Sequence, residues 1–128
     1  MLVATGCAGL APPATLAGTS WQLVRFQGGD GTVLAPDERA KYTVHFGADG
    51  RLAARLDCNR GTGSWKSPGE GRLELGPMAV TRAMCAPGSI DHEVAKRLFH
   101  VRSYVMKDGR LFLAMMADGG VFELEPAP

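Results

Sequence analysis

The sequence predicts an α+β fold, in which a strongly curved antiparallel sheet or open barrel carries one short helix. Three observations support this fold class. Apolar and polar residues alternate in several segments, turns rich in glycine and aspartate separate those segments, and one segment alone has helical spacing. The length of 128 residues corresponds to a single domain. We expect that domain over residues 16–128, after a signal remnant and flexible tether over residues 1–15.

The predicted strands follow one another in antiparallel order. Residues 42–46 and 52–56 alternate in polarity on either side of a Gly-Ala-Asp-Gly turn, which predicts a β-hairpin. The last three segments are joined by Lys-Asp-Gly and Asp-Gly-Gly turns, which predict a three-stranded meander. In chain order, the expected strands cover residues 21–26, 42–46, 52–56, 64–66, 72–75, 101–106, 111–116 and 121–124.

One segment departs from the strand pattern. Ile90, Val94 and Leu98 lie at i, i+4 and i+8, and a Pro-Gly pair precedes them. This spacing predicts a short helix over about residues 90–100. We expect its apolar face to close one side of the antiparallel sheet.

The charge balance excludes one class of partner. The chain has 14 Lys and Arg against 13 Asp and Glu, a formal net charge of +1. Binding to a phosphate backbone requires a strong basic excess, so we expect no nucleic-acid partner. No stretch approaches the roughly 18 apolar residues that a membrane-spanning helix requires. We expect a monomer with a protein partner.

The first residues resemble the signal of a bacterial lipoprotein. Ala4, Thr5 and Gly6 before Cys7 are similar to a lipobox, where a signal peptidase cuts and a lipid is attached to the cysteine. The apolar stretch before this motif is shorter than the roughly 7–15 residues of a full signal. We expect a lipid anchor at Cys7 and a location at the outer membrane facing the periplasm, or in the periplasm. The alternative is a disordered tail with an incidental cysteine.

The sequence has no convincing metal or catalytic motif. His92 and Glu93 begin like a zinc-protease helix, but Lys96 stands where that motif needs its second histidine. Cys58, Cys85 and His92 lack the paired-cysteine spacing of a zinc site. We therefore expect no metal, no cofactor and no enzymatic activity.

A pair of carboxylates near the C-terminus has a simple interpretation. Glu123 and Glu125 lie two positions apart and face the same side of a predicted strand. Such pairs are more often a solvated face than an acid/base pair. No serine lies in a nucleophile-elbow motif. A hydrolase or redox enzyme of another type is the remaining catalytic hypothesis.

The two cysteines inside the predicted domain carry the clearest signal. Cys58 and Cys85 are 27 positions apart, each at the end of a strand-like segment. In an exported protein such a pair is interpreted first as a disulfide, which would stabilise the domain by about 3.5 kcal/mol. Free buried thiols and a redox or metal role are the alternatives, although no Cys-x-x-Cys motif is present.

A polar, glycine-rich stretch follows Cys58. Asn59 is the only asparagine of the chain, and Arg60, Trp65 and Lys66 complete a candidate binding loop between residues 60 and 71. Tryptophan and arginine are favoured anchors in protein interfaces. The alternative for Asn59 and Arg60 is a structural turn, since asparagine and glycine tolerate left-handed backbone conformations. We favour the structural interpretation of these two residues.

Several motifs together resemble the META domain, also called the HslJ-like family, of bacterial outer-membrane and periplasmic proteins. The resemblance rests on the order and spacing of Asp-Cys-Asn-Arg-Gly-Thr-Gly-Ser-Trp, with Thr-Arg-Ala-Met-Cys after it, and it extends over residues 16–125. Gly-Thr-Ser-Trp-Gln-Leu at residues 18–23 and Asp-Gly-Arg-Leu-Phe-Leu at 108–113 complete the pattern. Asp57 stands where the family usually has glycine.

This resemblance implies a small β-rich fold with one helix and frequent occurrence as a lipoprotein. It also implies links to heat shock, antibiotic tolerance, secretion and motility, but it brings no catalytic mechanism. The leading hypothesis is a non-catalytic envelope lipoprotein domain with a binding or stress-response role. The alternative is an inhibitor of an envelope enzyme such as a lysozyme or protease.

Overall fold

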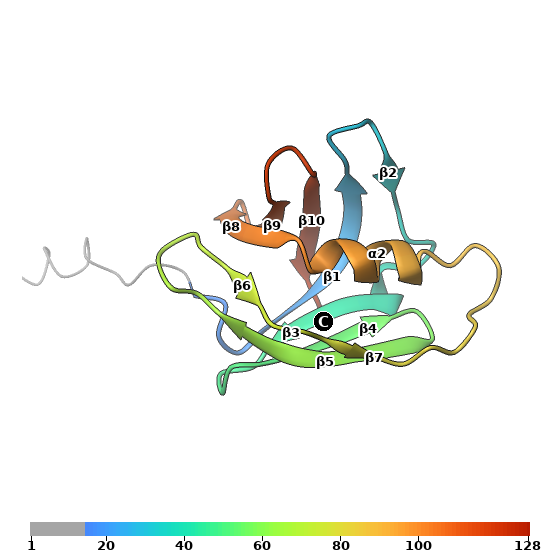
Figure 1. Ribbon diagram of the computed structural model, residues 1–128, viewed down its shortest axis with the longest axis horizontal. Helices are drawn as coiled ribbons and strands as arrows, with labels where there is room; N and C mark the ends of the chain where they lie inside the picture. The colour runs from blue at the N-terminus through green and yellow to red at the C-terminus, as the bar shows by residue number, and fades with distance from the viewer. Residues whose placement is uncertain (1–14) are drawn as a thin grey trace, which may run out of the picture.

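The computed structural model describes residues 15–128, which form a curved antiparallel sheet with one α-helix and one short 3-10 helix (Figure 1). The predicted lipid anchor at Cys7 and nearly all of the predicted tether lie outside the described residues. In chain order, the elements are β1 (Thr19–Gln27), β2 (Val33–Leu34), η1 (Arg39–Lys41), β3 (Tyr42–Phe46), β4 (Arg51–Leu56), β5 (Asn59–Lys66), β6 (Glu74–Leu75), β7 (Ala79–Val80), α2 (Asp91–Leu98), β8 (Val101–Lys107), β9 (Arg110–Met115) and β10 (Val121–Pro126).

The strands form a nearly closed barrel. Neighbouring strands follow the order β6-β5-β4-β3-β1-β10-β9-β8, with β2 paired to β1 and β7 paired to β5. The two ends of this order meet where the Leu73 amide donates to the Arg102 carbonyl at 3.0 Å and the Tyr104 amide donates to the Gly71 carbonyl at 2.9 Å. The sheet therefore closes on itself through the segment before β6.

Helix α2 covers the part of the barrel that the strands leave open, between β7 and the strands around β8 (Figure 1). Its Val94 and Leu98 are buried in the same hydrophobic cluster as the barrel interior. Burying a side chain of this size stabilises the fold by about 1.5–3 kcal/mol. The helix therefore covers the opening between the strands and contributes side chains to the core.

The core lies inside the barrel and follows the period-2 pattern of the strands. Phe26, Phe46 and Phe122 are almost completely inaccessible to solvent, as are Leu111 and Leu113. Buried positions alternate with partly or fully exposed ones in β3, β4, β9 and β10. The predicted α+β fold class, with a curved antiparallel sheet and one short helix, is confirmed.

The structure differs from the predicted elements at β5. Residues 59–63 belong to this strand, whereas the sequence indicated a turn there. The glycines serve close packing: a Cβ atom at Gly61 would lie 2.9 Å from the Met78 sulfur, and one at Gly63 would lie 2.9 Å from the Pro77 carbonyl oxygen. Glycine inside a strand often marks such an approach of another chain segment. Here the approaching segment leads into β7.

The turn between β4 and β5 is shorter than expected, and it precedes residues 59–63. Leu56 pairs with Asn59, so Asp57 and Cys58 alone connect β4 to β5. Asp57 has φ of 60°, in the left-handed region that favours glycine. This conformation gives a physical reason for the glycine that the family usually has at this position.

Candidate functional site

The predicted cysteine pair is a disulfide. Cys58 lies in the turn after β4 and Cys85 in the segment between β7 and α2, with their Cα atoms 5.5 Å apart. The free-thiol and metal alternatives for this pair are therefore excluded in this structure. The bond attaches residues 81–90, which contain no strand or helix before α2, to the end of the β4–β5 hairpin.

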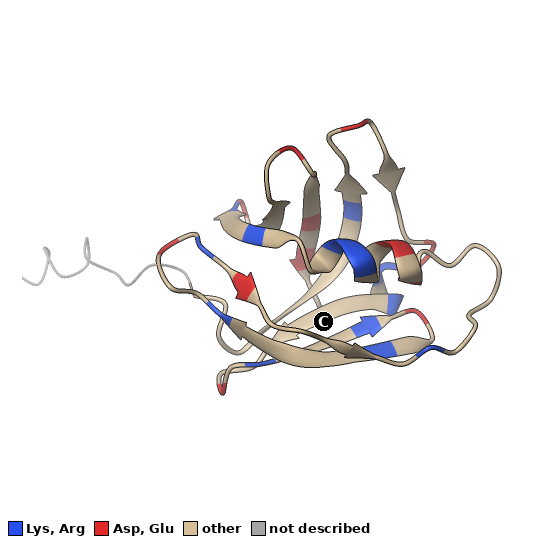
Figure 2. Ribbon diagram, in the orientation of Figure 1, with Lys and Arg blue, Asp and Glu red and all other residues tan. Residues whose placement is uncertain are grey.

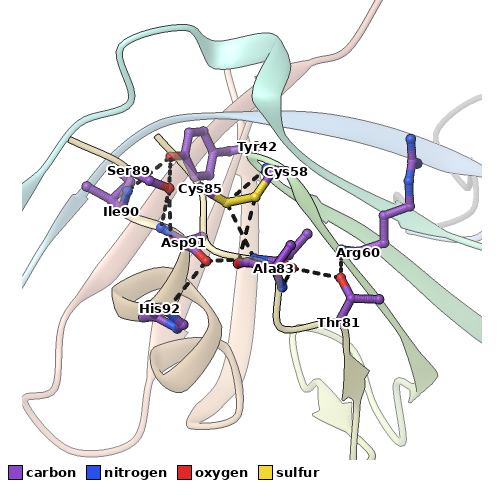
Figure 3. Close-up of polar contacts among 11 residues, drawn as sticks. Tyr42, Cys58, Arg60, Thr81, Ala83, Cys85, Ser89, Ile90, Asp91 and His92 are labelled. Atoms are coloured by element: carbon purple, nitrogen blue, oxygen red, sulfur yellow. Dashed lines mark hydrogen bonds and ion pairs between the residues drawn. A yellow bond between two sulfur atoms is a disulfide. The ribbon is translucent and has the colours of Figure 1, made fainter. Parts of the chain in front are cut away.

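The Asn59 side chain continues this attachment inside the protein, where its partners Thr81, Ala83 and Asp91 are labelled in Figure 3. Its amide oxygen accepts hydrogen bonds from the Thr81 hydroxyl at 2.9 Å and from the Ala83 amide at 2.7 Å. Its amide nitrogen donates to the Ala83 carbonyl and to Asp91 Oδ2, both at 2.9 Å. Asn59 is 1% exposed, so its polar capacity is used within the fold. We call Asn59, Thr81, Ala83, Ser89 and Asp91 the Asn59 network.

The network extends to the start of α2. Asp91 is 6% exposed and receives a hydrogen bond from the Ser89 hydroxyl at 2.9 Å. The Tyr42 hydroxyl accepts from the Ile90 amide at 3.1 Å and lies 3.3 Å from the Ser89 hydroxyl. The first turn of the helix is therefore attached to β3 and β5 by buried polar contacts.

Asp91 is ionised within this setting. Burial raises the pKa of Asp91, whereas hydrogen bonds from Ser89 and Asn59 and the neighbouring His92 lower it, and the result lies below the usual value for an aspartate. A general acid or base needs a pKa raised toward neutrality. This carboxylate instead serves as a hydrogen-bond acceptor that holds the Asn59 amide.

A groove of about 540 Å³ lies beside the network, between α2 and β7. Its apolar lining comes from β4, from β7 and the residue before it, and from one face of α2. The polar residues lie at the start of α2, farther along the helix, and where the chain leaves β7. The apolar members are Leu56, Met78, Val80, Ala95 and Phe99, and the polar ones are Thr81, Arg82, Asp91, His92 and Lys96.

The ionisable groups at the rim of this groove are mainly cationic. Arg82 is exposed and makes no ion pair within residues 15–128, and Lys96 pairs with Glu93 at 3.2 Å. Basic segments occur both on α2 and where the chain leaves β7 (Figure 2). The carboxylate in the lining, Asp91, already accepts two side-chain hydrogen bonds. The groove therefore combines an apolar lining with a positively charged rim.

The predicted binding residues lie along β5 and are not on a loop. The separation between Arg60 and Trp65 along a strand is about 3.3 Å per residue, which places them near opposite ends of β5. Trp65 donates its indole N–H to the Gly47 carbonyl at 2.9 Å, and Lys66 pairs with Glu74 at 3.4 Å. A second hollow of about 550 Å³ lies beside Trp65 and Lys66. A binding role for these side chains stays a prediction.

The C-terminal carboxylates lie on the outer surface, where β10 runs between β1 and β9. Glu123 pairs with Arg25 at 3.5 Å and with Arg110, and Glu125 pairs with Arg39 at 2.9 Å. We call this partly exposed row of ion pairs the carboxylate ladder. A hydrogen bond from Gln22 and the Arg39 guanidinium lower the pKa of Glu125 below its usual range.

The sequence interpretation missed the groove itself. His92, Ala95, Lys96 and Phe99 have the i, i+3, i+4, i+7 spacing of a helix face, next to the buried face that was predicted. This second face contains a half-exposed phenylalanine, which was the available signal. Its partner across the groove, β7, has only two residues and no detectable period.

Within residues 15–128, no cluster of three His, Cys, Asp or Glu side chains is placed to hold a metal ion. In the same part of the chain, no helix is long and apolar enough to cross a membrane.

These features define a class: a small antiparallel barrel, closed by one helix and stabilised by a disulfide that ties the helix connection to the β4–β5 turn. The sequence matches the META domain over residues 14–127, and the chain belongs to this family. No curated protein matches the sequence significantly.

Two solved structures have the same fold. An NMR structure of a protein from Burkholderia xenovorans has a TM-score of 0.72 at 24% identity, covering 88% of this chain and 83% of that one. A crystal structure of a duf4847 family protein from Bacteroides vulgatus has a TM-score of 0.64 at 17% identity, covering 86% of this chain and 93% of that one. At these identities, the likeness extends to the fold alone.

Proposed function

We propose that this chain is a non-catalytic binding domain of the bacterial cell envelope, with a role in the envelope stress response. Its partner is a protein with an acidic surface, held in the groove between α2 and β7. The observation that carries the proposal is the contrast within the groove. The apolar lining and Arg82 are free of internal polar contacts within residues 15–128, and Lys96 has only an exposed ion pair with Glu93, whereas Asn59 and Asp91 are engaged in internal hydrogen bonds.

The charge at the groove rim supports a partner with an acidic surface. Arg82 and Lys96 stand on opposite sides of the groove. Opposite charges at the rim of an interface steer association and fix orientation. The apolar lining supplies the burial that holds the partner in place.

The disulfide and the first residues support the proposed location in the cell envelope. Disulfides persist in oxidising compartments such as the periplasm. The lipobox-like Ala-Thr-Gly-Cys at residues 4–7 supports a lipid anchor at Cys7 on the outer membrane, with the domain facing the periplasm. A domain tethered in this way would be close to the proteins of the cell envelope.

Photo-crosslinking of the full chain in a bacterial host that exports it tests the proposal. The variant Phe99→benzoylphenylalanine places an aromatic probe in the apolar lining of the groove and keeps Arg82 and Lys96, and His45→benzoylphenylalanine places it on an exposed position of β3 outside the groove. We expect an envelope-protein adduct from the groove position that disappears when Arg82→Glu is added. Equal adducts from both positions, or none from the groove, would overturn the proposed function.

A second candidate, inhibition of an envelope lysozyme or protease, is favoured by one observation. Met84 is 97% exposed on the segment that the Cys58–Cys85 disulfide holds. A rigid projecting segment is suited to entering a catalytic cleft. The purified domain would then inhibit muramidases or proteases at micromolar concentration, and Met84→Ala would abolish the inhibition while Arg82→Glu would not.

A further inference from the structure

The outer edge of β7 has free backbone groups. β7 pairs with β5 through Gly61↔Val80 and Thr62↔Ala79, and the Thr81 amide donates to the Arg60 carbonyl at 2.9 Å. In an antiparallel pair, successive residues direct their backbone groups alternately toward and away from the partner. The Val80 N–H and C=O therefore point away from β5.

No strand among residues 15–128 pairs with that edge. β6, which pairs with β5 farther along the strand on the side away from β4, lies next to the segment that closes the barrel onto β8 through residues 71–73. β7 has no such cover, and its outer side is the groove lined by Met78, Val80 and α2. An open edge of this kind is a template for an added strand.

The side chains beside this edge specify what the added strand would contain. Residues of a strand alternate between two faces, so every second side chain of an added segment would enter the groove, toward Ala95 and Phe99. That surface is apolar. Arg82 lies at one end of β7 and Lys96 lies across the groove on α2, so the remaining side chains would meet positive charge.

We propose that the partner inserts an extended acidic segment into this groove, where it pairs with β7 as an additional strand. Apolar side chains of the segment contact Val80, Ala95 and Phe99, and its carboxylates pair with Arg82 and Lys96. The Val80 amide and carbonyl supply the main-chain hydrogen bonds. This inference rests on the proposed function and adds to it the conformation and chemistry of the bound segment.

The test uses a capped hexapeptide of alternating glutamate and valine, titrated into the isotopically labelled full-length chain. We expect shifts in residues 78–82 and along α2, and slower hydrogen exchange at the Val80 amide by at least about tenfold at saturation. The Ala79 amide, which the register directs toward β5, is the internal control. A peptide with lysine in place of glutamate, and one N-methylated at alternate amides, should bind more weakly.

Two kinds of variant separate main-chain pairing from charge. Val80→Pro removes the outward N–H, and Val80→Ala is the matched control that keeps it. We expect Val80→Pro to weaken peptide binding about three- to tenfold relative to Val80→Ala, the range of one backbone hydrogen bond. If proline disturbs folding, Arg82→Glu with Lys96→Glu provides the second test, because this pair should reverse the preference between the glutamate and lysine peptides.

The outcomes distinguish this inference from the function on which it rests. Peptide binding without slower exchange at Val80 would overturn strand addition. Failure of the peptide together with a persistent adduct at the Phe99 probe would overturn the inference and leave the binding function standing. A concentration-dependent dimer in ultracentrifugation, dissociated by the peptide, would assign the edge to a second copy of this chain and would also overturn it.

Discussion

Two polar clusters of this barrel use similar residues in opposite settings. The Asn59 network lies under the start of α2, where Asn59 is 1% and Asp91 6% exposed. The carboxylate ladder lies on the outer surface, where the side chains of Glu123 and Glu125 are 21% exposed. Water can replace a lost partner on the surface but not in the interior. We therefore expect the network to determine stability and the ladder to contribute little.

The largest effect is expected from the disulfide that accompanies the network. The double variant Cys58→Ala with Cys85→Ala opens a loop of 27 residues, which should lower the free energy of unfolding by about 3–4 kcal/mol in the chain-entropy model. Urea denaturation of both proteins measures this difference. The wild-type chain under reducing conditions is the control and should show a similar loss. A loss below about 1 kcal/mol would mean that the Asn59 network alone holds residues 81–90 in place.

The network itself is tested by a matched pair of amides. Asn59→Ala removes the acceptor of the Ala83 amide and the side-chain donor to Asp91 Oδ2, and we expect it to cost about 2–3 kcal/mol. Gln22→Ala removes the amide that donates to Glu125 at 2.6 Å in the ladder, and we expect a loss below about 1 kcal/mol. Equal losses in thermal or urea unfolding would contradict the distinction between the two clusters.

Regular burial along an element explains which parts of the fold the sequence could predict. The long strands and the helix were predicted because half-buried elements repeat their burial at period two or 3.6, as in residues 42–46 and around Val94. β2 and β7 have two residues each, which is too short to show a period. The glycines of β5 were interpreted as turn residues because glycine is common in turns. In the structure they leave room for Met78 and Pro77, and the sequence does not show this contact between separate segments.

The groove was beyond sequence reasoning for a related reason. Its lining comes from β4, β7, the segment after β7 and α2, and only the folded barrel brings these together. Asn59 was favoured as a structural residue, and its hydrogen bonds support that interpretation. Its hydrogen-bond partners, Thr81 and Ala83, are not marked by any motif in the sequence. They lie beside Asn59 in the fold, where Cys85 is bonded to Cys58.

The pH dependence of the free energy of unfolding also distinguishes the two clusters, because each contains a carboxylate. The pKa values of Asp91 and Glu125 both lie below their usual range, so each carboxylate stabilises the fold above its unfolded pKa of about 4 and loses this contribution as the pH falls. Because Asp91 is buried and Glu125 is near solvent, we expect Asp91→Asn to flatten the fall in the free energy of unfolding between about pH 5 and pH 2. Glu125→Gln should follow the wild-type curve closely. The opposite ranking would place the acid-sensitive interactions in the ladder.

The smallest effect on stability is expected at the turn directly before Asn59. Asp57 adopts φ of 60°, a conformation that costs a residue with a Cβ about 1 kcal/mol more than glycine. Asp57→Gly removes this strain but increases the freedom of the unfolded chain, so we expect a net gain of up to about 0.5 kcal/mol. Asp49→Gly, at an exposed position of another hairpin turn without positive φ, is the control and should be neutral or destabilising.

The sign of the Asp57→Gly effect also bears on the network. Arg55 donates its side-chain N–H to the Asp57 carbonyl at 3.1 Å, and the Asp57 amide donates to the Lys41 carbonyl at 2.7 Å. Both contacts use the backbone of residue 57 and survive the substitution. Glycine should therefore keep Cys58 and Asn59 in position, with unchanged amide exchange at Ala83. A loss of protection at Ala83 would mean that the aspartate side chain restricts the turn in a way that the family's usual glycine does not.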